Sequence, residues 1–410
     1  MTSALRNIPR GIWILAFAAL ALRVAFMVAS VDLADDNYNE FGEIARNIRA
    51  GHGYALFHFE GETLSPWFSE DALPFPSAFM PPGYVLYVYP FLGIADPVGR
   101  NVLLLLIQHL AGGLVVVLVF LLARKMYTPR AAWAAAILAA VLPDMVASTS
   151  TYGATVFVHL LLLGIFLHFE RSMPPHTWLR ALLLGCLLGV LVLFRFEALA
   201  FALLVMGLAW RRAGLGFVWK VAIVLVLLLS PWIVRNTLVF HRPLLSTSLG
   251  LNAYRGNNAE AIGAWPDSQL DELLPALAGP QFEVRMSGVY LDSAWTYAVS
   301  KPGKTLLRSV VKGLRLWTFN PNDDRAGHPV RLAVWAFLLV LALLGCQGVR
   351  AHPYIPAYFA YATVMAFVFF ALARHQVLME IALIPLAGHG LARSCTFMRL
   401  YSKKRSPENP

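Results

Sequence analysis

An aspartate pair, Asp35 and Asp36, directly follows the first apolar segment of the chain and precedes Asn37 and Tyr38. A carboxylate at such a place can act as a general base or orient the hydroxyl group of an acceptor for a displacement reaction. The same residues could instead cap a helix, because aspartate is stabilised in the first turn by the helix dipole. Spacing alone leaves both roles open.

Charged residues also interrupt apolar segments farther along the chain. Arg235 closes an apolar run after Trp232. Its guanidinium could grip a phosphate with two hydrogen bonds, although a Trp-Arg pair also anchors helices at membrane surfaces. Arg195 and Glu197 form either a local ion pair or part of a functional site, since ionisable residues within membrane segments are often functional. A similar group comprises Arg374, His375 and Glu380.

Other apparent motifs predict no cofactor. Residues 302–305 resemble the end of a phosphate-binding loop, but Ala298 stands where the first glycine is required. The histidines show no metal-ligand spacing. Three widely separated cysteines predict no disulfide framework. No cofactor is therefore expected, and dependence on a divalent metal is left open.

The composition indicates an integral membrane protein. Hydrophobic residues make up 58% of the 410-residue chain, charged residues 14%, and mean hydropathy is +0.62. Soluble domains carry about 25% charged residues. The net charge of +10 does not indicate a nucleic-acid partner, because membrane proteins concentrate basic residues in their cytoplasmic loops.

Apolar runs predict an all-α membrane domain of about ten helices, because a bilayer core about 30 Å thick requires such runs. The basic clusters all fall on one side under this alternation, so both termini are expected in the cytoplasm. The first run is interpreted as an uncleaved span rather than a signal peptide. The predicted spans are 11–31, 100–123, 131–149, 153–169, 180–194, 197–210, 217–234, 330–347, 354–373 and 376–393.

One transmembrane domain, 1–393, and a basic cytoplasmic tail, 394–410, are predicted. Two long loops, about 32–99 and 235–329, should face outward. The first loop contains an amphipathic helical pattern that stops at glycines near residue 51. The aromatic stretch 84–95 is too short to span and is expected to be interfacial or re-entrant, and the basic amphipathic stretch 301–317 should lie along the outer membrane surface.

Four segments together resemble the GT-C membrane glycosyltransferases, in the branch of protein O-mannosyltransferases and aminoarabinose transferases. The first contains Asp35-Asp36 with Tyr38 and the helix that follows, and the second is residues 77–84. The third contains Arg195-Phe196-Glu197, and the fourth combines residues 231–236 with Gly250 and Gly256-Asn257-Asn258.

The resemblance implies an inverting transferase that uses a polyprenyl-phosphate-linked sugar at the extracytoplasmic face of a bacterial inner membrane. The acceptor could be a lipid, a glycan or a protein. Asp36 would position or deprotonate the acceptor, with Asp35 as the alternative because the spacing is one residue off the family pattern. Three arginines would neutralise the departing phosphate. The implied substrate-binding set is Arg195, Glu197, Arg235, Asn257, Arg374, His375 and Tyr84.

Two positions depart from the family pattern. Met80 stands where relatives carry a basic residue, and Thr151-Tyr152-Gly153-Ala154 where many carry a glutamate. The chain has no large soluble C-terminal domain, which argues against asparagine glycosylation. The alternatives are a lipid or solute transporter, for which neither repeated halves nor broken helices are evident, and a non-catalytic membrane assembly protein.

Overall fold

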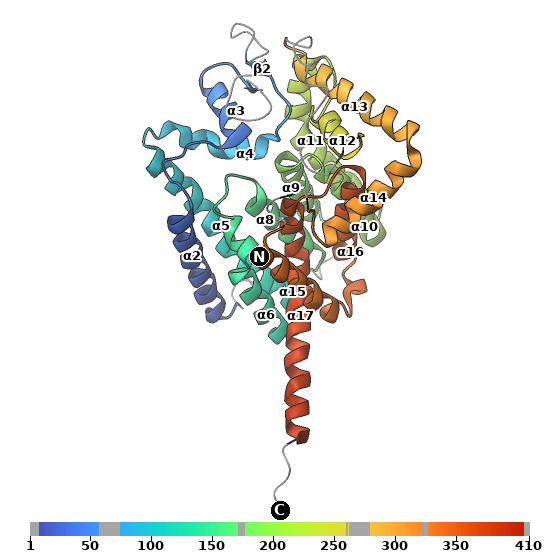
Figure 1. Ribbon diagram of the computed structural model, residues 1–410. Coiled ribbons are helices and arrows are strands. Elements are labelled where there is room, and N and C mark those ends of the chain that lie inside the picture. The colour runs from blue at the N-terminus through green and yellow to red at the C-terminus, as the bar shows by residue number, and fades with distance from the viewer. Residues whose placement is uncertain are drawn as a thin grey trace, which may run out of the picture.

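The computed structural model is a bundle of long helices capped at one end by short helices and loops (Figure 1). It describes residues 8–56, 74–170, 177–259, 261, 279–321, 323 and 327–405, with side chains to residue 395. Parts of both predicted loops, 57–73 and 262–278, and the end of the predicted tail, 406–410, lie outside the described residues.

The predicted helices are present, with bounds that differ by a few residues in most cases. Helices α2, α5 and α11 are long and apolar enough to cross a membrane, and α6, α8, α9, α15 and α16 are shorter apolar helices. The α-helices of the bundle are α2 (Arg10–Ser30), α5 (Pro97–Met126), α6 (Pro129–Val141), α7 (Pro143–Ala147), α8 (Thr155–Phe169), α9 (Trp178–Phe194), α10 (Ala198–Ala213), α11 (Leu215–Phe240), α15 (Pro329–Gly345), α16 (Tyr354–Val368) and α17 (Ala373–Arg405).

Two predicted spans differ from the structure. The expected helix 131–149 is divided into α6 and α7 at Pro143, because proline has no N–H to donate to the carbonyl four residues earlier. The last helix does not end near residue 393. It continues to Arg405 and projects from the end of the bundle away from the loops (Figure 1).

Both long loops fold at one end of the bundle, here called the loop end (Figure 1). The first loop forms α3 (Asn39–Arg49), α4 (Pro82–Val88), the 3-10 helix η2 (Tyr89–Gly93) and a two-stranded antiparallel sheet of β1 (Ala55–Leu56) and β2 (Phe75–Pro76). The second forms α12 (Leu249–Gly256), α13 (Phe282–Ser300) and α14 (Pro302–Trp317). A short 3-10 helix, η5 (Val349–Ala351), connects α15 and α16.

The helix predicted from the amphipathic pattern in the first loop is confirmed. The amphipathic pattern becomes α3, and Gly51 after it has a φ of +88°, a left-handed conformation that glycine adopts without steric cost. The short aromatic stretch becomes α4 and η2. One hydrophobic cluster joins Ile44 and Tyr84 of the first loop to Phe282 and Met286 of the second. The two loops therefore share a core at the loop end.

Arg23 explains how the break at Pro143 is stabilised inside the bundle. Its side chain is 1% exposed although it lies in the middle of α2. The guanidinium donates to the carbonyl oxygens of Ala139 at 3.0 Å and Ala140 at 3.2 Å. The proline leaves the first of these carbonyls without its helical donor, and the turn out of α6 frees the second. Arg23 thus replaces the two missing backbone hydrogen bonds.

We expect Arg23→Leu to lower the free energy of unfolding by about 2 to 4 kcal/mol, because each buried carbonyl that loses its donor costs about 1 to 3 kcal/mol. The thermal midpoint of the purified protein in detergent measures this loss. Adding Pro143→Ala to Arg23→Leu should restore part of it, since alanine supplies the N–H for Ala139. A stable Arg23→Leu variant would contradict the capping role.

Candidate active site

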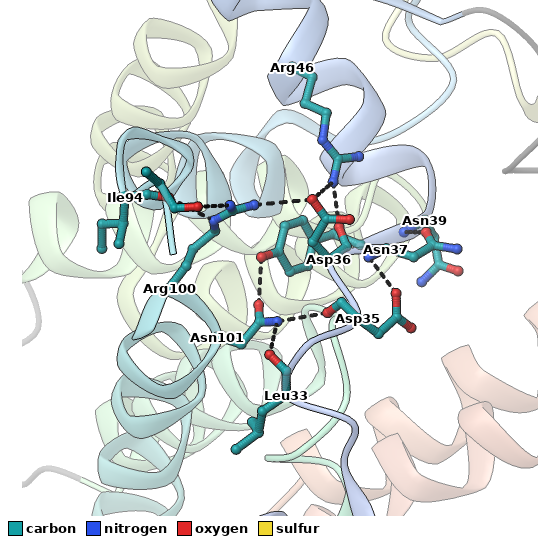
Figure 2. Close-up of polar contacts among 11 residues, drawn as sticks. Leu33, Asp35, Asp36, Asn37, Asn39, Arg46, Ile94, Arg100 and Asn101 are labelled. Carbon is teal, nitrogen blue, oxygen red and sulfur yellow. Dashed lines mark hydrogen bonds and ion pairs between the residues drawn. The ribbon is translucent and has the colours of Figure 1, made fainter. Parts of the chain in front are cut away.

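Asp36 lies at the loop end, between α2 and α3, and contacts two arginines (Figure 2). Its carboxylate oxygen is 3.2 Å from the Arg46 guanidinium and 3.3 Å from that of Arg100. Arg46 also donates to the Asp36 backbone oxygen. The Asp36 side chain is 53% exposed, whereas that of Arg100 is 10% exposed. A fixed and accessible carboxylate of this kind can accept a hydrogen bond from a bound hydroxyl group.

The loop around this carboxylate is held by a buried amide. Asn101, on α5, is fully buried and donates to the backbone oxygens of Leu33 at 2.9 Å and Asp35 at 2.7 Å. The Tyr38 hydroxyl donates to the Asn101 side-chain oxygen at 2.5 Å. Burial raises the pKa of the Tyr38 phenol, with Arg100 acting in the opposite direction. Because these bonds hold the backbone before Asp36 and the Tyr38 side chain after it, the position of Asp36 is set by α5 and not by α3 alone.

Asp35 has a different environment. Its carboxylate accepts only a local hydrogen bond among those described, from the backbone N–H of Asn37 at 2.9 Å. Figure 2 shows it pointing away from Arg46 and Arg100. The residue is exposed. The structure therefore distinguishes a carboxylate fixed by two guanidinium groups, Asp36, from a neighbouring one that is held by its own turn.

The arginines predicted to meet Asp36 lie elsewhere. Arg195 and Glu197 connect α9 to α10, and the Arg195 Nε donates to the Glu197 carboxylate at 2.7 Å. His375 accepts from the backbone N–H of Leu372 at 3.2 Å where α17 begins. The charges of Arg195 and Arg374 act on both Glu197 and His375, so these four residues lie close enough to interact electrostatically.

Arg235 contacts the first loop. Its guanidinium donates to the backbone oxygens of Ser77 at 2.5 Å and Tyr54 at 2.7 Å. It also lies 5.5 Å from the ring centroids of Tyr54 and Trp232 and 5.6 Å from that of Phe240. The Arg235 guanidinium therefore binds the backbone of the first loop. The described hydrogen bonds and ion pairs of Asp36 thus involve Arg46 and Arg100, and they do not include Arg195, Arg235 or Arg374.

Tyr84 and Asn257, the other two predicted binding residues, pack between elements. Tyr84 is fully buried, and its hydroxyl donates to Gln108 at 2.9 Å. The Asn257 amide donates to the backbone oxygens of Ala253 and Val368, each at 2.8 Å, and its oxygen accepts from Lys312 at 3.2 Å. The substrate-binding roles of both residues stay predictions.

Glu283, on α13, joins the two long loops. It is 1% exposed and accepts from the Ala78 backbone N–H at 2.7 Å and from the Thr247 hydroxyl. Burial raises the pKa of this carboxyl group to about 7, although the hydrogen bonds from its neighbours and the charge of Arg235 oppose the increase. The Glu283 carboxyl group therefore loses its proton more easily in the unfolded chain than in the folded protein. Its ionisation favours unfolding and so weakens the contact between the two loops.

We therefore expect the stability of the protein to fall as pH rises from about 4.5 to about 7, because the folded-state pKa lies above the ordinary value. The free energy of unfolding should be lower above this window than below it by about 3 kcal/mol. Glu283→Gln keeps the shape and should remove this slope in thermal midpoints measured across the window. Asp292→Asn, an exposed carboxylate on the same helix, is the matched control and should retain the slope. Parallel pH profiles for the wild type and Glu283→Gln would contradict the assignment.

A second acidic group was not predicted as a site from the sequence. Asp144, on α7, lies 3.0 Å from the Arg331 Nε at the start of α15. Arg331 also donates to Gln376 at 2.9 Å and to the backbone oxygen of Ala373 at 3.1 Å. The Glu380 side chain is buried beside this group, and its Oε2 has no hydrogen-bond partner within the part of the chain that the structure describes. The helix break at Pro143, which places Asp144, was the available sequence signal.

The described residues contain no group of three His, Cys, Asp or Glu side chains that could hold a metal ion. The Asp36 carboxylate faces two guanidinium groups, those of Arg46 and Arg100.

No protein-family model matches this sequence. A comparison with curated proteins also yields no match. Comparison of structures does find similar proteins. The chain is similar to the archaeal oligosaccharyltransferase AglB from Archaeoglobus fulgidus, in complex with an inhibitory peptide and a dolichol-phosphate, with 12% identity and a TM-score of 0.53. The match covers 97% of this chain and 52% of that one, so this chain spans about half the length of the oligosaccharyltransferase.

The chain is also similar to ArnT from Cupriavidus metallidurans bound to undecaprenyl phosphate, with 14% identity and a TM-score of 0.40 over 96% of this chain and 81% of that one. At the level of fold, the similarity to the oligosaccharyltransferase confirms the all-α, GT-C-like membrane architecture that the sequence motifs predicted.

Proposed function

We propose that this protein is an inverting glycosyltransferase that moves a sugar from a polyprenyl-phosphate carrier to an acceptor at the outer face of the membrane. The observation that carries the proposal is the position of Asp36 in the first loop, fixed by Arg46 and Arg100 yet half exposed. The fold supports it, because the oligosaccharyltransferase with a similar fold is described with a dolichol-phosphate. Nucleotide sugars are not expected outside the cytoplasm, so a membrane-bound phosphate carrier suits this location.

In the proposed reaction, the hydroxyl group of the acceptor attacks the anomeric carbon of the donor sugar. The new carbon–oxygen bond forms on the face opposite the phosphate, and the bond to the phosphate oxygen breaks with its electron pair. Asp36 accepts the proton of the attacking hydroxyl, as a general base does. The polyprenyl phosphate leaves as an anion, and fixed guanidinium groups stabilise its growing charge.

Arg195 and Arg374 are the guanidinium groups proposed for the phosphate. Arg195 directly follows the end of α9, and Arg374 lies in the first turn of α17. Glu197 orients Arg195 through their ion pair. Arg235 has a different proposed role, the docking of the first loop, because its guanidinium already bridges two backbone carbonyls of that loop.

Mass spectrometry of surface lipids and glycans from cells with and without the protein tests the proposal. Without the protein, a polyprenyl-phosphate-linked sugar should accumulate, and one lipid, glycan or glycoprotein should lack that sugar. In vesicles that contain the purified protein and the donor, release of polyprenyl phosphate should require the acceptor. Movement of intact donor across the vesicle membrane without release would favour a transporter instead.

A further inference from the structure

Helix α14 presents its apolar side outward. Its exposed side chains follow one another at helical spacing and are Leu306, Leu307, Val310 and Leu314. Two basic residues of the same helix, Arg308 and Lys312, point inward. Arg308 donates to the backbone oxygen of Ala259 at 2.9 Å, and Lys312 donates to that of Gly256 at 3.1 Å. A helix on a water-facing surface has the opposite arrangement.

The apolar face of α14 is continuous with the outer surface of α16. Gly313 packs so closely against the ring of Phe367 that a Cβ at this position would clash with it. Lys312 reaches the backbone oxygen of Val368 at 3.4 Å. The exposed apolar residues of α16 next to this contact are Val364, Phe367 and Val368. Since α16 is a predicted membrane span, α14 extends a surface that already faces lipid.

Helix α13 has a divided outer face. Leu291, Trp295 and Val299 form one exposed row at intervals of four residues. Asp292, Thr296 and Ser300 form a second exposed row beside the first. A helix at the boundary between lipid and water requires this division, with apolar side chains below and polar ones above. Tryptophan is also enriched at that boundary.

Two lysines mark the turn between the helices. Lys301 and Lys304 are both exposed, next to the apolar rows. Exposed ammonium groups at this level are complementary to the phosphates of lipid headgroups, and anionic lipids attract them. The apolar side chains of α13 and α14 therefore match the acyl chains of one leaflet. The polar row of α13 and the two lysines match its headgroups.

We propose that the α13–α14 hairpin is inserted into one leaflet of the bilayer, with α14 against the acyl chains and α13 at the headgroup level. Its occupant is the bilayer itself, not a protein partner. This differs from the expectation that stretch 301–317 lies on the membrane surface, because the side of α14 that would have faced water is apolar. The proposal does not depend on the chemistry of sugar transfer.

Nitroxide labels at three positions test the proposal in the full chain. Cys186, Cys346 and Cys395 are first replaced by serine, and single cysteines are introduced as Trp295→Cys, Thr296→Cys or Leu307→Cys. The labelled proteins are reconstituted into bilayers of phosphatidylethanolamine and phosphatidylglycerol. Spin relaxation then compares collisions with oxygen, which concentrates in lipid, and with a water-soluble nickel chelate. Thermal midpoints in detergent verify that each variant folds like the cysteine-free protein.

We expect the oxygen-to-nickel collision ratio to be several-fold higher at positions 295 and 307 than at position 296. Thr296→Cys is the matched control, because it is adjacent to Trp295 on the same exposed side of α13. Equally low ratios at all three positions would overturn the proposal, because they would place the hairpin in water. Exclusion of both reagents from position 307 would also overturn it, because a protein would then cover α14.

Discussion

Asp36→Asn should lower the rate of glycosyl transfer on the order of a hundredfold or more, because a general base contributes roughly 10²- to 10⁴-fold to a reaction rate. The amide keeps the shape of the side chain but accepts no proton. Expression and thermal midpoint should change little, since the Asp36 side chain is half exposed, the amide can still accept a hydrogen bond from Arg100, and exposed ion pairs contribute little to stability. Transfer is measured in proteoliposomes that contain the donor lipid and the acceptor.

Asp32→Asn is the matched control, because Asp32 lies in the same loop and its carboxylate accepts only the Ala34 backbone N–H, at 2.9 Å, among the described contacts. It should retain near wild-type transfer. Asp35→Asn tests the neighbouring carboxylate. If Asp35→Asn abolished transfer and Asp36→Asn did not, the general base would be Asp35. Full activity in both variants would refute an aspartate base in this loop.

Arg235→Lys should destabilise the protein nearly as much as Arg235→Gln, although lysine keeps the positive charge. A single ammonium group cannot bridge the Tyr54 and Ser77 carbonyls while it stacks against Trp232. Loss of two charge-assisted hydrogen bonds should cost about 2 to 4 kcal/mol in stability. The thermal midpoint and the KM for the lipid donor are measured together.

These two measurements separate docking from phosphate binding. If Arg235 docks the loop, the thermal midpoint falls in both variants and kcat falls with it. If Arg235 instead binds the phosphate of the donor, Arg235→Lys should keep the midpoint and most of kcat, with a change mainly in KM. Arg242→Lys, at an exposed arginine shortly after α11, is the control and should leave both quantities unchanged.

The membrane class and the helices were accessible from sequence because apolar runs are a local property. A run near twenty residues predicts a span wherever it lies, and the loop helices α3 and α14 have amphipathic patterns that need no tertiary information. The break within 131–149 was not predicted, although Pro143 is a local signal for it. The extension of α17 to Arg405 was not predicted, because the apolar run ends earlier and only backbone hydrogen bonding continues.

Some residues of the candidate site could be identified from the sequence, but the contacts between them could not. Asp36 was selected because a charged pair after an apolar run is unusual. Its partners Arg46 and Arg100 lie 10 and 64 residues farther along the chain. No sequence pattern links residues at such separations. Asp144 and Arg331 were missed for the same reason, since their ion pair depends on how α7 and α15 pack.

By itself, the sequence determined that this chain is a helical membrane protein, where most of its helices lie and which charged residues are placed where chemistry is plausible. These features depend on hydropathy and side-chain type within short windows. Only the tertiary structure decided that Asp36 is held by Arg46 and Arg100, that Arg235 serves the first loop, and that α14 turns its leucines outward. A helical pattern defines two faces, but the neighbouring elements decide which face is covered, because burial and pairing arise between segments that are distant in the chain.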